Sequence, residues 1–296
     1  PKVYMKVDFL GIGAQKCAST WVYRVLSDHP EVAVMPGKEI DFFSYYYNFG
    51  YEWYERHIGE VDPLKKVGEV SPSYFADIHT PERVYLYNPN MRIVLSLRDP
   101  IERAYSNHLH EVRLGHVTGE NLEFEKGLKN NPMYLIQSQY SQQLARWLDV
   151  FPSDQIMVIF QEDIRDDPVI QAQKLYQFLG ISEDHRSWFL ERKVNESFVI
   201  KNTKVDYLLK QLGKLGRSLG AGGFIETIKR NDLVRDIRRQ HNQIDLRQII
   251  SPISNDTRTS LLEILADDMC VLSEQLKREN LPWPSWRALK NKVTAD

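Results

Sequence analysis

A short segment near the start of the chain carries residues suited to holding a phosphate group. The run Phe9-Leu-Gly-Ile-Gly has the pattern of a buried strand, and a loop of small residues containing Lys16 follows it. A helix is predicted to open on Ser19 and Thr20. Such a turn gathers backbone N–H groups, a helix N-terminus, an ammonium and two hydroxyls around one point, an arrangement that binds anions. We therefore expect a phosphate site at residues 13–20.

The order of residues in this loop departs from two common phosphate-binding motifs. The P-loop of ATP-using enzymes needs Gly directly before its Lys and Ser or Thr directly after it. Here Gln15 precedes Lys16 and Cys17 follows it. A dinucleotide-binding turn needs a third glycine at the position of Lys16. Taken alone, the segment also fits a tight turn with a surface lysine, and a P-loop-type kinase using ATP and magnesium is kept as the alternative function.

A second segment strengthens the phosphate interpretation. Arg98 follows the apolar run Arg92-Ile-Val-Leu-Ser-Leu, at the strand end where ligands bind in open parallel sheets. Ser106 comes eight residues later, on a helix predicted from Pro100. A guanidinium fork and a hydroxyl at this spacing can share one phosphate. The alternatives are an ion pair of Arg98 with Asp99 or another carboxylate, and a solvated position for Ser106.

Short apolar runs alternate with helical patterns along the first two hundred residues. Strands are predicted at 7–12, 31–35, 66–70, 92–98 and 155–161, and helices at 19–28, from 80, from 100 and at 168–179. Strands that alternate with helices build βαβ units and a parallel sheet. The predicted fold class is α/β: a single P-loop-like domain with a central, mainly parallel sheet flanked by helices.

The character of the chain changes near residue 201. Residues 201–250 carry eleven Lys or Arg against five Asp or Glu and show no strong strand pattern. An apolar helical pattern follows at 256–276. We therefore predict one domain over 1–296, with an α/β core at 1–200 and a helical, basic C-terminal portion at 201–296. The basic stretch could line an acceptor site or an anionic surface, or be a solvated helix face, which is the commonest case.

Composition narrows the class of protein further. The chain has 296 residues, near the upper limit for one hydrophobic core, and a net charge of −2, which gives no nucleic-acid signature. Its two cysteines, Cys17 and Cys270, make no disulfide framework, and no apolar run is long enough to span a bilayer. No cluster has metal-ligand spacing. We expect a cytoplasmic protein without a metal, and leave open a membrane anchor outside this sequence.

Several blocks together resemble one enzyme family. Gln15-Lys-Cys-Ala-Ser-Thr resembles the 5′-phosphosulfate loop of sulfotransferases that use 3′-phosphoadenosine 5′-phosphosulfate (PAPS), and Arg98 to Ser106 resembles their 3′-phosphate segment. The similarity is greatest to the heparan sulfate N- and 3-O-sulfotransferase branch and its bacterial relatives. The supporting blocks, in the family's order, are Lys38-Glu-Ile-Asp-Phe-Phe-Ser, Ser71-Pro-Ser-Tyr-Phe, Pro81-Glu-Arg-Val-Tyr and Asn88-Pro. Beyond about residue 108 the resemblance is loose.

The resemblance implies how the loop would hold the nucleotide. The backbone N–H groups from Cys17 through Ala18, Ser19 and Thr20, with the two hydroxyls, would bind the 5′-phosphate of PAPS. Lys16 would contact the same phosphate and the bridging oxygen that leaves. Sulfuryl transfer by in-line displacement depends on positioning and charge stabilisation, as phosphoryl transfer does. No metal is needed, and the product is 3′-phosphoadenosine 5′-phosphate (PAP).

The same resemblance assigns a catalytic base. The Glu of the Lys-Glu-x-x-Phe-Phe block is Glu39, which would take the proton from a hydroxyl or amine acceptor, including that of a carbohydrate. His108 and His110 are rival bases, and at i, i+2 on a helix at most one points inward. Two departures bear on the acceptor, since 3-O-sulfating enzymes carry His where this chain has Asp41 and Lys where it has Val70. Both departures weaken the case for a heparan-type acceptor specifically.

Further nucleotide contacts are implied around the middle of the chain. Arg98 and Ser106 would bind the 3′-phosphate, and Lys193 falls where the family places a basic loop over the nucleotide. Trp188 or Phe189 would stack on adenine, although each is more often a core residue. We expect a small-molecule or glycan acceptor, no nucleic acid and no membrane span; the sequence does not specify the oligomeric state.

Overall fold

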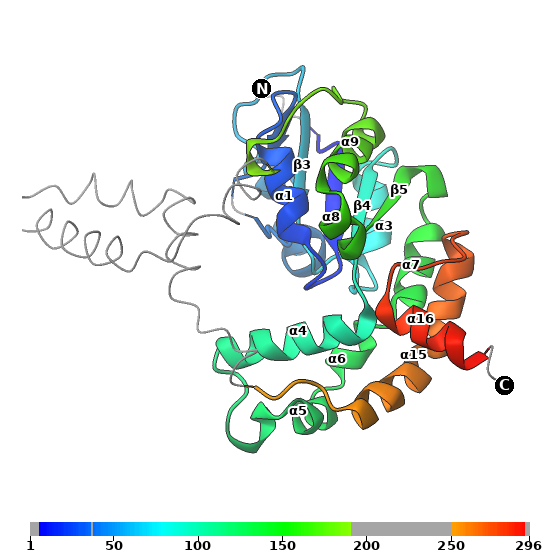
Figure 1. Ribbon diagram of the computed structural model, residues 1–296. Helices are drawn as coiled ribbons and strands as arrows, with labels where there is room; N and C mark the ends of the chain where they lie inside the picture. The colour runs from blue at the N-terminus through cyan, green and yellow to red at the C-terminus, as the bar shows by residue number, and fades with distance from the viewer. Residues whose placement is uncertain (1–5, 37, 191–249, 294–296) are drawn as a thin grey trace, which may run out of the picture. The chain divides into compact units, whose positions relative to one another are not determined.

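The computed structural model describes residues 6–36, 38–190 and 250–293. The described part contains one sheet of five parallel strands in the order β2-β3-β1-β4-β5. The strands are β1 (Phe9–Gly13), β2 (Val32–Val34), β3 (Lys66–Val70), β4 (Arg92–Leu97) and β5 (Ile156–Phe160). Each falls in or overlaps a segment predicted as extended, so the predicted parallel α/β sheet is confirmed (Figure 1).

Strand β1 lies at the centre of the sheet, and all five of its residues are buried. A strand covered on both faces reads as a continuous apolar run, as this one does. Phe9 lies opposite Gly68 of β3 on one side and Arg92 of β4 on the other. A Cβ atom on Gly68 would lie 2.3 Å from the Phe9 ring. The glycine therefore makes room for the ring in the middle of the sheet.

Three helices share an apolar core with the sheet: α1 (Ser19–Ser27), α8 (Gln161–Asp166) and α9 (Pro168–Leu179). Val25 of α1 and Leu175 of α9 are fully buried in this core. Helix α9 ends at Gly180, whose φ of 68° is the left-handed conformation that favours glycine at a helix end. Both the helix and its stop agree with the sequence prediction.

The other elements before residue 156 connect the strands and extend the domain beyond the sheet (Figure 1). They are η1 (Phe42–Tyr46), η2 (Tyr47–Phe49), α2 (Tyr51–Glu55), α3 (Thr80–Tyr87), α4 (Pro100–Arg113), η3 (Gly119–Leu122), α5 (Phe124–Asn130), α6 (Met133–Ile136), α7 (Tyr140–Leu148) and η4 (Ser153–Gln155). Helix α4 starts directly after β4, because the Asp99 carboxylate accepts from the N–H groups of Ile101 and Glu102 and so caps it.

The C-terminal helices pack on the α/β part. Helix α15 (Asn255–Gln275) contacts α7 and α4, and α16 (Pro284–Val293) follows it. The Asp268 carboxylate of α15 accepts from the backbone N–H groups of Tyr140 and Ser141 at the start of α7. The predicted helix at 256–276 is thereby confirmed. Residues 191–249 lie outside the described part, so the domain boundaries stay a prediction.

The carboxyl ends of the three central strands meet at one edge of the sheet, because all strands are parallel. Strand β1 runs into the predicted phosphate loop, β3 into Ser71, and β4 into Arg98. The loop is tied to β4, since Ala14 N–H donates to the Ser96 carbonyl at 2.7 Å and the Ser96 hydroxyl donates to the Gly13 carbonyl at 3.0 Å. This edge brings the candidate residues together.

Candidate active site

The loop after β1 presents an uncapped helix end. Lys16 and Ala18 have φ values of 66° and 71°, a left-handed conformation that non-glycine residues seldom adopt. Ala18 is the N-cap of α1, no side chain caps the helix, and its first turn carries no acidic residue. The first N–H groups of α1 therefore lack the usual side-chain acceptor and fit an anion. The predicted strand, loop and helix are all confirmed.

Lys16 is held in a partly dehydrated position next to the candidate base. Burial lowers its pKa to about 8, and the charge of Glu39 opposes that shift. Lys38 and Arg113 lower the pKa further, because like charges disfavour the ammonium form. An anion placed among these cations would be attracted to all three, with little competing water around Lys16.

Lys38 is a site residue that the sequence reasoning did not assign. Its ammonium lies 2.9 Å from the Thr20 hydroxyl, 3.3 Å from the Ser19 hydroxyl and 3.3 Å from the Glu39 carboxylate. The Lys38–Glu39 ion pair joins the two segments, because Lys38 also reaches the start of α1. The sequence signal that could have identified Lys38 is its position directly before Glu39.

The segment that carries Glu39 has an unusual backbone. Glu39 and Asp41 have φ values of 74° and 55°, and the Glu39 N–H donates to the Val70 carbonyl at 3.1 Å. The Asp41 N–H donates to the Ser71 hydroxyl at 3.0 Å. The Glu39 side chain is 52% exposed. These bonds hold the carboxylate at the carboxyl edge of the sheet, open to an acceptor.

A buried carboxyl group supports this turn from below. Glu69 accepts hydrogen bonds from the hydroxyls of Tyr54, Tyr74 and Ser71 at 2.6–2.8 Å. Burial raises its pKa to about 7, and the three hydroxyl donors oppose the rise. Since the Ser71 hydroxyl also accepts from Asp41, the network ties β3 to the turn that carries Glu39.

Arg98 lies at the end of β4 as predicted, with 16% of its side chain exposed. Its guanidinium pairs with Glu102 at 3.7 Å, not with Asp99. The Tyr140 hydroxyl donates to the Arg98 carbonyl at 2.9 Å and lies 3.5 Å from the Cys17 sulfur. One buried tyrosine therefore connects the two predicted phosphate segments. Burial raises the pKa of Cys17 to about 11, so its thiol stays neutral near pH 7.

The face of α4 that follows Arg98 looks toward the loop. Ser106 is half-buried, and His110 lies one turn further along the same face. The pKa of His110 is lowered first by burial and then by the charge of Lys16. His108 is fully buried and its Nε2 lies 2.9 Å from the Leu122 carbonyl. Of the two rival bases, His110 is therefore the one near the candidate site.

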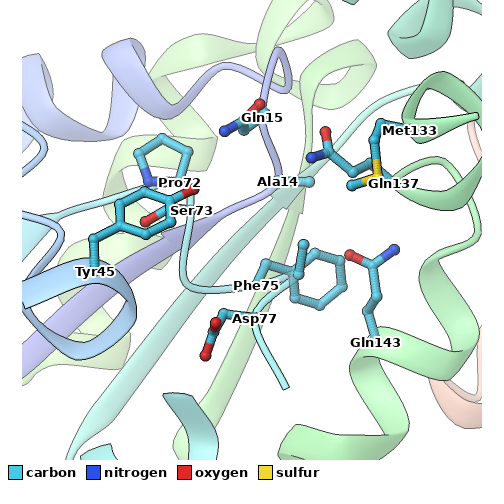
Figure 2. A pocket seen from close by; sticks show the side chains of 11 residues that line it. Ala14, Gln15, Tyr45, Pro72, Ser73, Phe75, Asp77, Met133, Gln137 and Gln143 are labelled. Carbon is cyan, nitrogen blue, oxygen red and sulfur yellow. The ribbon is translucent and has the colours of Figure 1, made fainter. Parts of the chain in front are cut away.

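The aromatic residues from Phe42 to Tyr54 divide between the core and a cavity. Phe42, Phe43 and Tyr54 are fully buried; the Phe42 and Tyr54 rings stack, and the Phe43 ring meets both of them edge-to-face. Only Tyr45 reaches the cavity that lies beside the phosphate loop, which measures about 190 Å³ (Figure 2). The described residues that line it are Ala14, Gln15, Tyr45, Pro72, Ser73, Phe75, Ala76, Asp77, Met133, Gln137 and Gln143.

The structure treats the three remaining nucleotide contacts implied by the resemblance in different ways. Lys193 lies outside the described residues and stays a prediction. Trp188 is 43% exposed, whereas Phe189 packs against the apolar core under α1 and α9. Among the residues that the structure describes, no group of three His, Cys, Asp or Glu side chains is placed to hold a metal ion.

Comparisons with known proteins identify the family. The sulfotransferase domain family matches residues 6–218. A membrane-associated sulfotransferase, kil1, of Dictyostelium discoideum is 25% identical over 68% of this chain and 62% of its own length. Human bifunctional heparan sulfate N-deacetylase/N-sulfotransferase 2 is 29% identical over 59% of this chain and 22% of its own length. Human heparan sulfate glucosamine 3-O-sulfotransferase 5 is 29% identical over 57% of this chain and 52% of its own length.

A solved structure has the same fold. The crystal structure of a sulfotransferase from Alicyclobacillus acidocaldarius superposes with a TM-score of 0.68, at 23% identity, over 96% of this chain and 99% of that one. The fold and the carboxyl-edge site thus define the class, and the chain belongs to the sulfotransferase family. The resemblance predicted from the sequence is confirmed, and with it the class of enzyme. The chain spans between about a fifth and three fifths of the first curated relatives it matches.

The expected cytoplasmic location is contradicted by the relatives. The Dictyostelium protein is named as membrane-associated. The prediction rested on two unpaired cysteines and on the lack of a long apolar run, and neither feature reports on membrane association. In the described part of the chain, no helix has both the length and the apolar character needed to cross a bilayer.

Proposed function

We propose that this chain transfers the sulfuryl group of PAPS to a hydroxyl or amine acceptor on a carbohydrate. One observation carries the proposal: a partly dehydrated Lys16 and the uncapped start of α1 lie beside an exposed carboxylate, Glu39, whose charge acts on Lys16. This arrangement supports an anion site and a base at the same edge of the sheet. The carbohydrate acceptor is supported by the relatives named for heparan sulfate.

The residues would divide the reaction between them. PAPS, when bound, supplies the sulfuryl group. Glu39 takes the proton from the acceptor, whose oxygen or nitrogen forms a bond to sulfur on the side opposite the bridging oxygen. The bond from sulfur to that oxygen breaks, and its electron pair leaves with PAP. Lys16 and the N–H groups at the start of α1 stabilise the charge that collects on the 5′-phosphate.

The positively charged side chains support a second phosphate position. Arg98, with 16% of its side chain exposed, lies close enough for its charge to lower the pKa of Cys17 in the loop. The Ser106 face of α4 follows it. We assign these two residues to the 3′-phosphate of PAP, with Lys193 as a further contact. Lys38 adds a cation between the 5′-phosphate loop and Glu39.

Two variants test the assignment of roles. Lys16→Ala should weaken PAP binding by about tenfold to a hundredfold, since a hydrogen bond to a charged group contributes about 1.5–3 kcal/mol. Glu39→Gln should lower transfer from PAPS by at least about a hundredfold, the lower range for general-base catalysis, and leave PAP affinity within about twofold. Binding is measured by calorimetry with a metal chelator present, and transfer with labelled PAPS and a panel of sugars.

Matched controls separate these effects from general damage. Glu52→Gln removes an exposed carboxylate on α2 that pairs with Arg56, and should leave both readouts unchanged. Full transfer by Glu39→Gln would remove Glu39 from the base role. The kinase alternative gains no support from the family match, and ATP hydrolysis without PAP binding would overturn the proposal in its favour.

A further inference from the structure

The cavity beside the phosphate loop is the candidate binding site for the acceptor. Its wall includes Gln15, the residue before Lys16, and Ser73, whose hydroxyl donates to the Asp41 carboxylate at 2.5 Å. Asp41 in turn lies two residues after Glu39. The cavity therefore borders both the anion loop and the turn that carries the candidate base. Its volume of about 190 Å³ is on the scale of one small ring.

One buried polar atom in this wall has no partner. Gln143 is 4% exposed, and its Nε2 donates to the Ile136 carbonyl at 3.0 Å and to the Gln139 carbonyl at 2.7 Å. Those two bonds fix the amide, and its Oε1 makes no hydrogen bond in the structure. Figure 2 shows this oxygen directed toward Phe75 and the interior of the cavity. An unpaired buried acceptor is costly, so the position suits a ligand that donates a hydrogen bond.

A second amide, on the same side of the cavity, offers the opposite function (Figure 2). The Gln137 Oε1 accepts from the buried guanidinium of Arg103 at 3.0 Å, which leaves its Nε2 facing the cavity (Figure 2). Tyr45, which is 69% exposed, contributes aromatic surface, and the buried Phe75 ring lies beside Gln143 (Figure 2). A fixed acceptor, a fixed donor and aromatic faces are what a sugar ring needs, because its hydroxyls both donate and accept and its C–H faces are apolar.

The charges of the wall argue against an acidic acceptor. Among the described residues that line the cavity none is Lys or Arg, and one, Asp77, is acidic. Two guanidiniums bond to residues that line the cavity, since Arg103 donates to Gln137 and one nitrogen of Arg146 donates to the Ala76 carbonyl at 3.3 Å. A carboxylate or sulfate on the acceptor would meet no cation in this wall and would face the Asp77 charge.

Resting on the proposed transferase function, we propose that this cavity binds an uncharged sugar residue of the acceptor, and that the enzyme prefers neutral glycans to uronic-acid or sulfated ones. The sugar donates a hydroxyl hydrogen to Gln143 Oε1 and accepts from Gln137 Nε2. Another hydroxyl of the same ring is presented toward Glu39. This preference separates the chain from the relatives named for heparan sulfate.

The test compares matched acceptors with labelled PAPS and the full chain. Oligosaccharides of glucose, mannose, galactose or N-acetylglucosamine are set against chains of equal length in which alternate sugars are glucuronic acid. We expect kcat/KM to be at least tenfold higher for the best neutral acceptor. Equal or higher kcat/KM for the acidic chains overturns the proposal, and so does transfer to neither class by enzyme that binds PAP. Absence of PAP binding would instead refute the transferase function.

A pair of charge variants tests the cavity itself. Met133→Lys places an ammonium at the cavity wall, and Ile136→Lys places one on the same short helix outside it; the native side chains are 42% and 50% exposed. Met133→Lys should shift the kcat/KM ratio toward acidic chains by about fivefold or more, an effect that salt weakens. Ile136→Lys should leave the ratio unchanged. Equal shifts in both variants would show that the cavity does not select the acceptor.

A third variant tests the hydrogen bond from the sugar to Gln143 Oε1. Gln143→Leu removes the unpaired Oε1 and should lower kcat/KM for the neutral acceptor by about threefold to tenfold, the range for one uncharged hydrogen bond. PAP affinity and the far-ultraviolet circular dichroism should stay unchanged. An unaltered kcat/KM in a folded Gln143→Leu enzyme would count against the sugar's place in this cavity.

Discussion

Lys16 should couple nucleotide binding to proton uptake. In the free protein burial lowers its pKa to about 8. Two phosphate charges placed against the ammonium would favour its charged form and return the pKa toward 10.5, the ordinary lysine value. The bound state then holds more protons than the free state, so affinity must fall as pH rises through 8, and Lys16 must add almost no pH dependence below 7.

The size of the effect follows from these two pKa values. At pH 8 about half of the free molecules have a neutral Lys16, so PAP binding should take up ~0.5 proton; at pH 9 the uptake should be ~0.9 and at pH 7 ~0.1. The dissociation constant should be about tenfold larger at pH 9 than at pH 7. Phosphate groups titrate near pH 6 and are already ionised over this range. The Cys17 thiol, with a pKa of about 11, keeps its proton.

Calorimetry in buffers of different ionisation enthalpy measures the uptake directly. The groups that act on Lys16 are Glu39, Arg113, Lys38 and Glu111, and a variant is needed that leaves them in place. Lys16→Arg does so, because arginine keeps its charge at every pH used. The variant should bind PAP with a nearly constant affinity between pH 7 and 9. Constant affinity and no proton uptake in the unsubstituted protein would refute the low pKa and the contact with phosphate together.

Two further predictions address the 3′-phosphate and the core. Arg98→Lys keeps the charge but loses the guanidinium fork, and it should weaken PAP binding about tenfold while leaving adenosine 5′-phosphate, which lacks the 3′-phosphate, unaffected in the same calorimetric assay. Gly68→Ala places a methyl group 2.3 Å from the Phe9 ring and should lower the free energy of unfolding in urea by about 1–3 kcal/mol. Adding Phe9→Leu should recover part of that loss, and an undiminished loss in the double variant would contradict the steric explanation.

The fold could be predicted because its signals are local and repeated. Strand β1 reads as an unbroken apolar run, and Pro81 and Gly180 mark a helix start and a helix end in agreement with the structure. Helices α5 and α6 were not predicted, because they are only seven and four residues long, too short for an apolar repeat to be recognised. Short helices of this kind depend on tertiary packing.

The sequence predicted only those residues of the candidate site that belong to a recognisable motif. The loop residues and Arg98 were placed correctly at the carboxyl edge of the sheet. Lys38 and Gln143 were missed, because their importance comes from contacts between distant segments: Lys38 reaches α1, and Gln143 on α7 faces a cavity formed after β1 and β3. No spacing rule within one element encodes such a contact. The cytoplasmic location failed for a different reason, since composition does not record association with a membrane.

Backbone strain connects the two halves of the site. Lys16 and Ala18 on the loop, and Glu39 and Asp41 on the facing turn, all have positive φ although none is glycine. Such conformations cost about 1–3 kcal/mol each and persist where surrounding structure fixes them. The turn is fixed by β3 and by the hydroxyl network around Glu69. Glycine would relieve this strain, but it has no side chain and a less restricted backbone. The non-glycine residues are therefore best explained by a need for their side chains, and for N–H groups held in fixed directions. The strain is thus independent support for the proposal that both segments build one site.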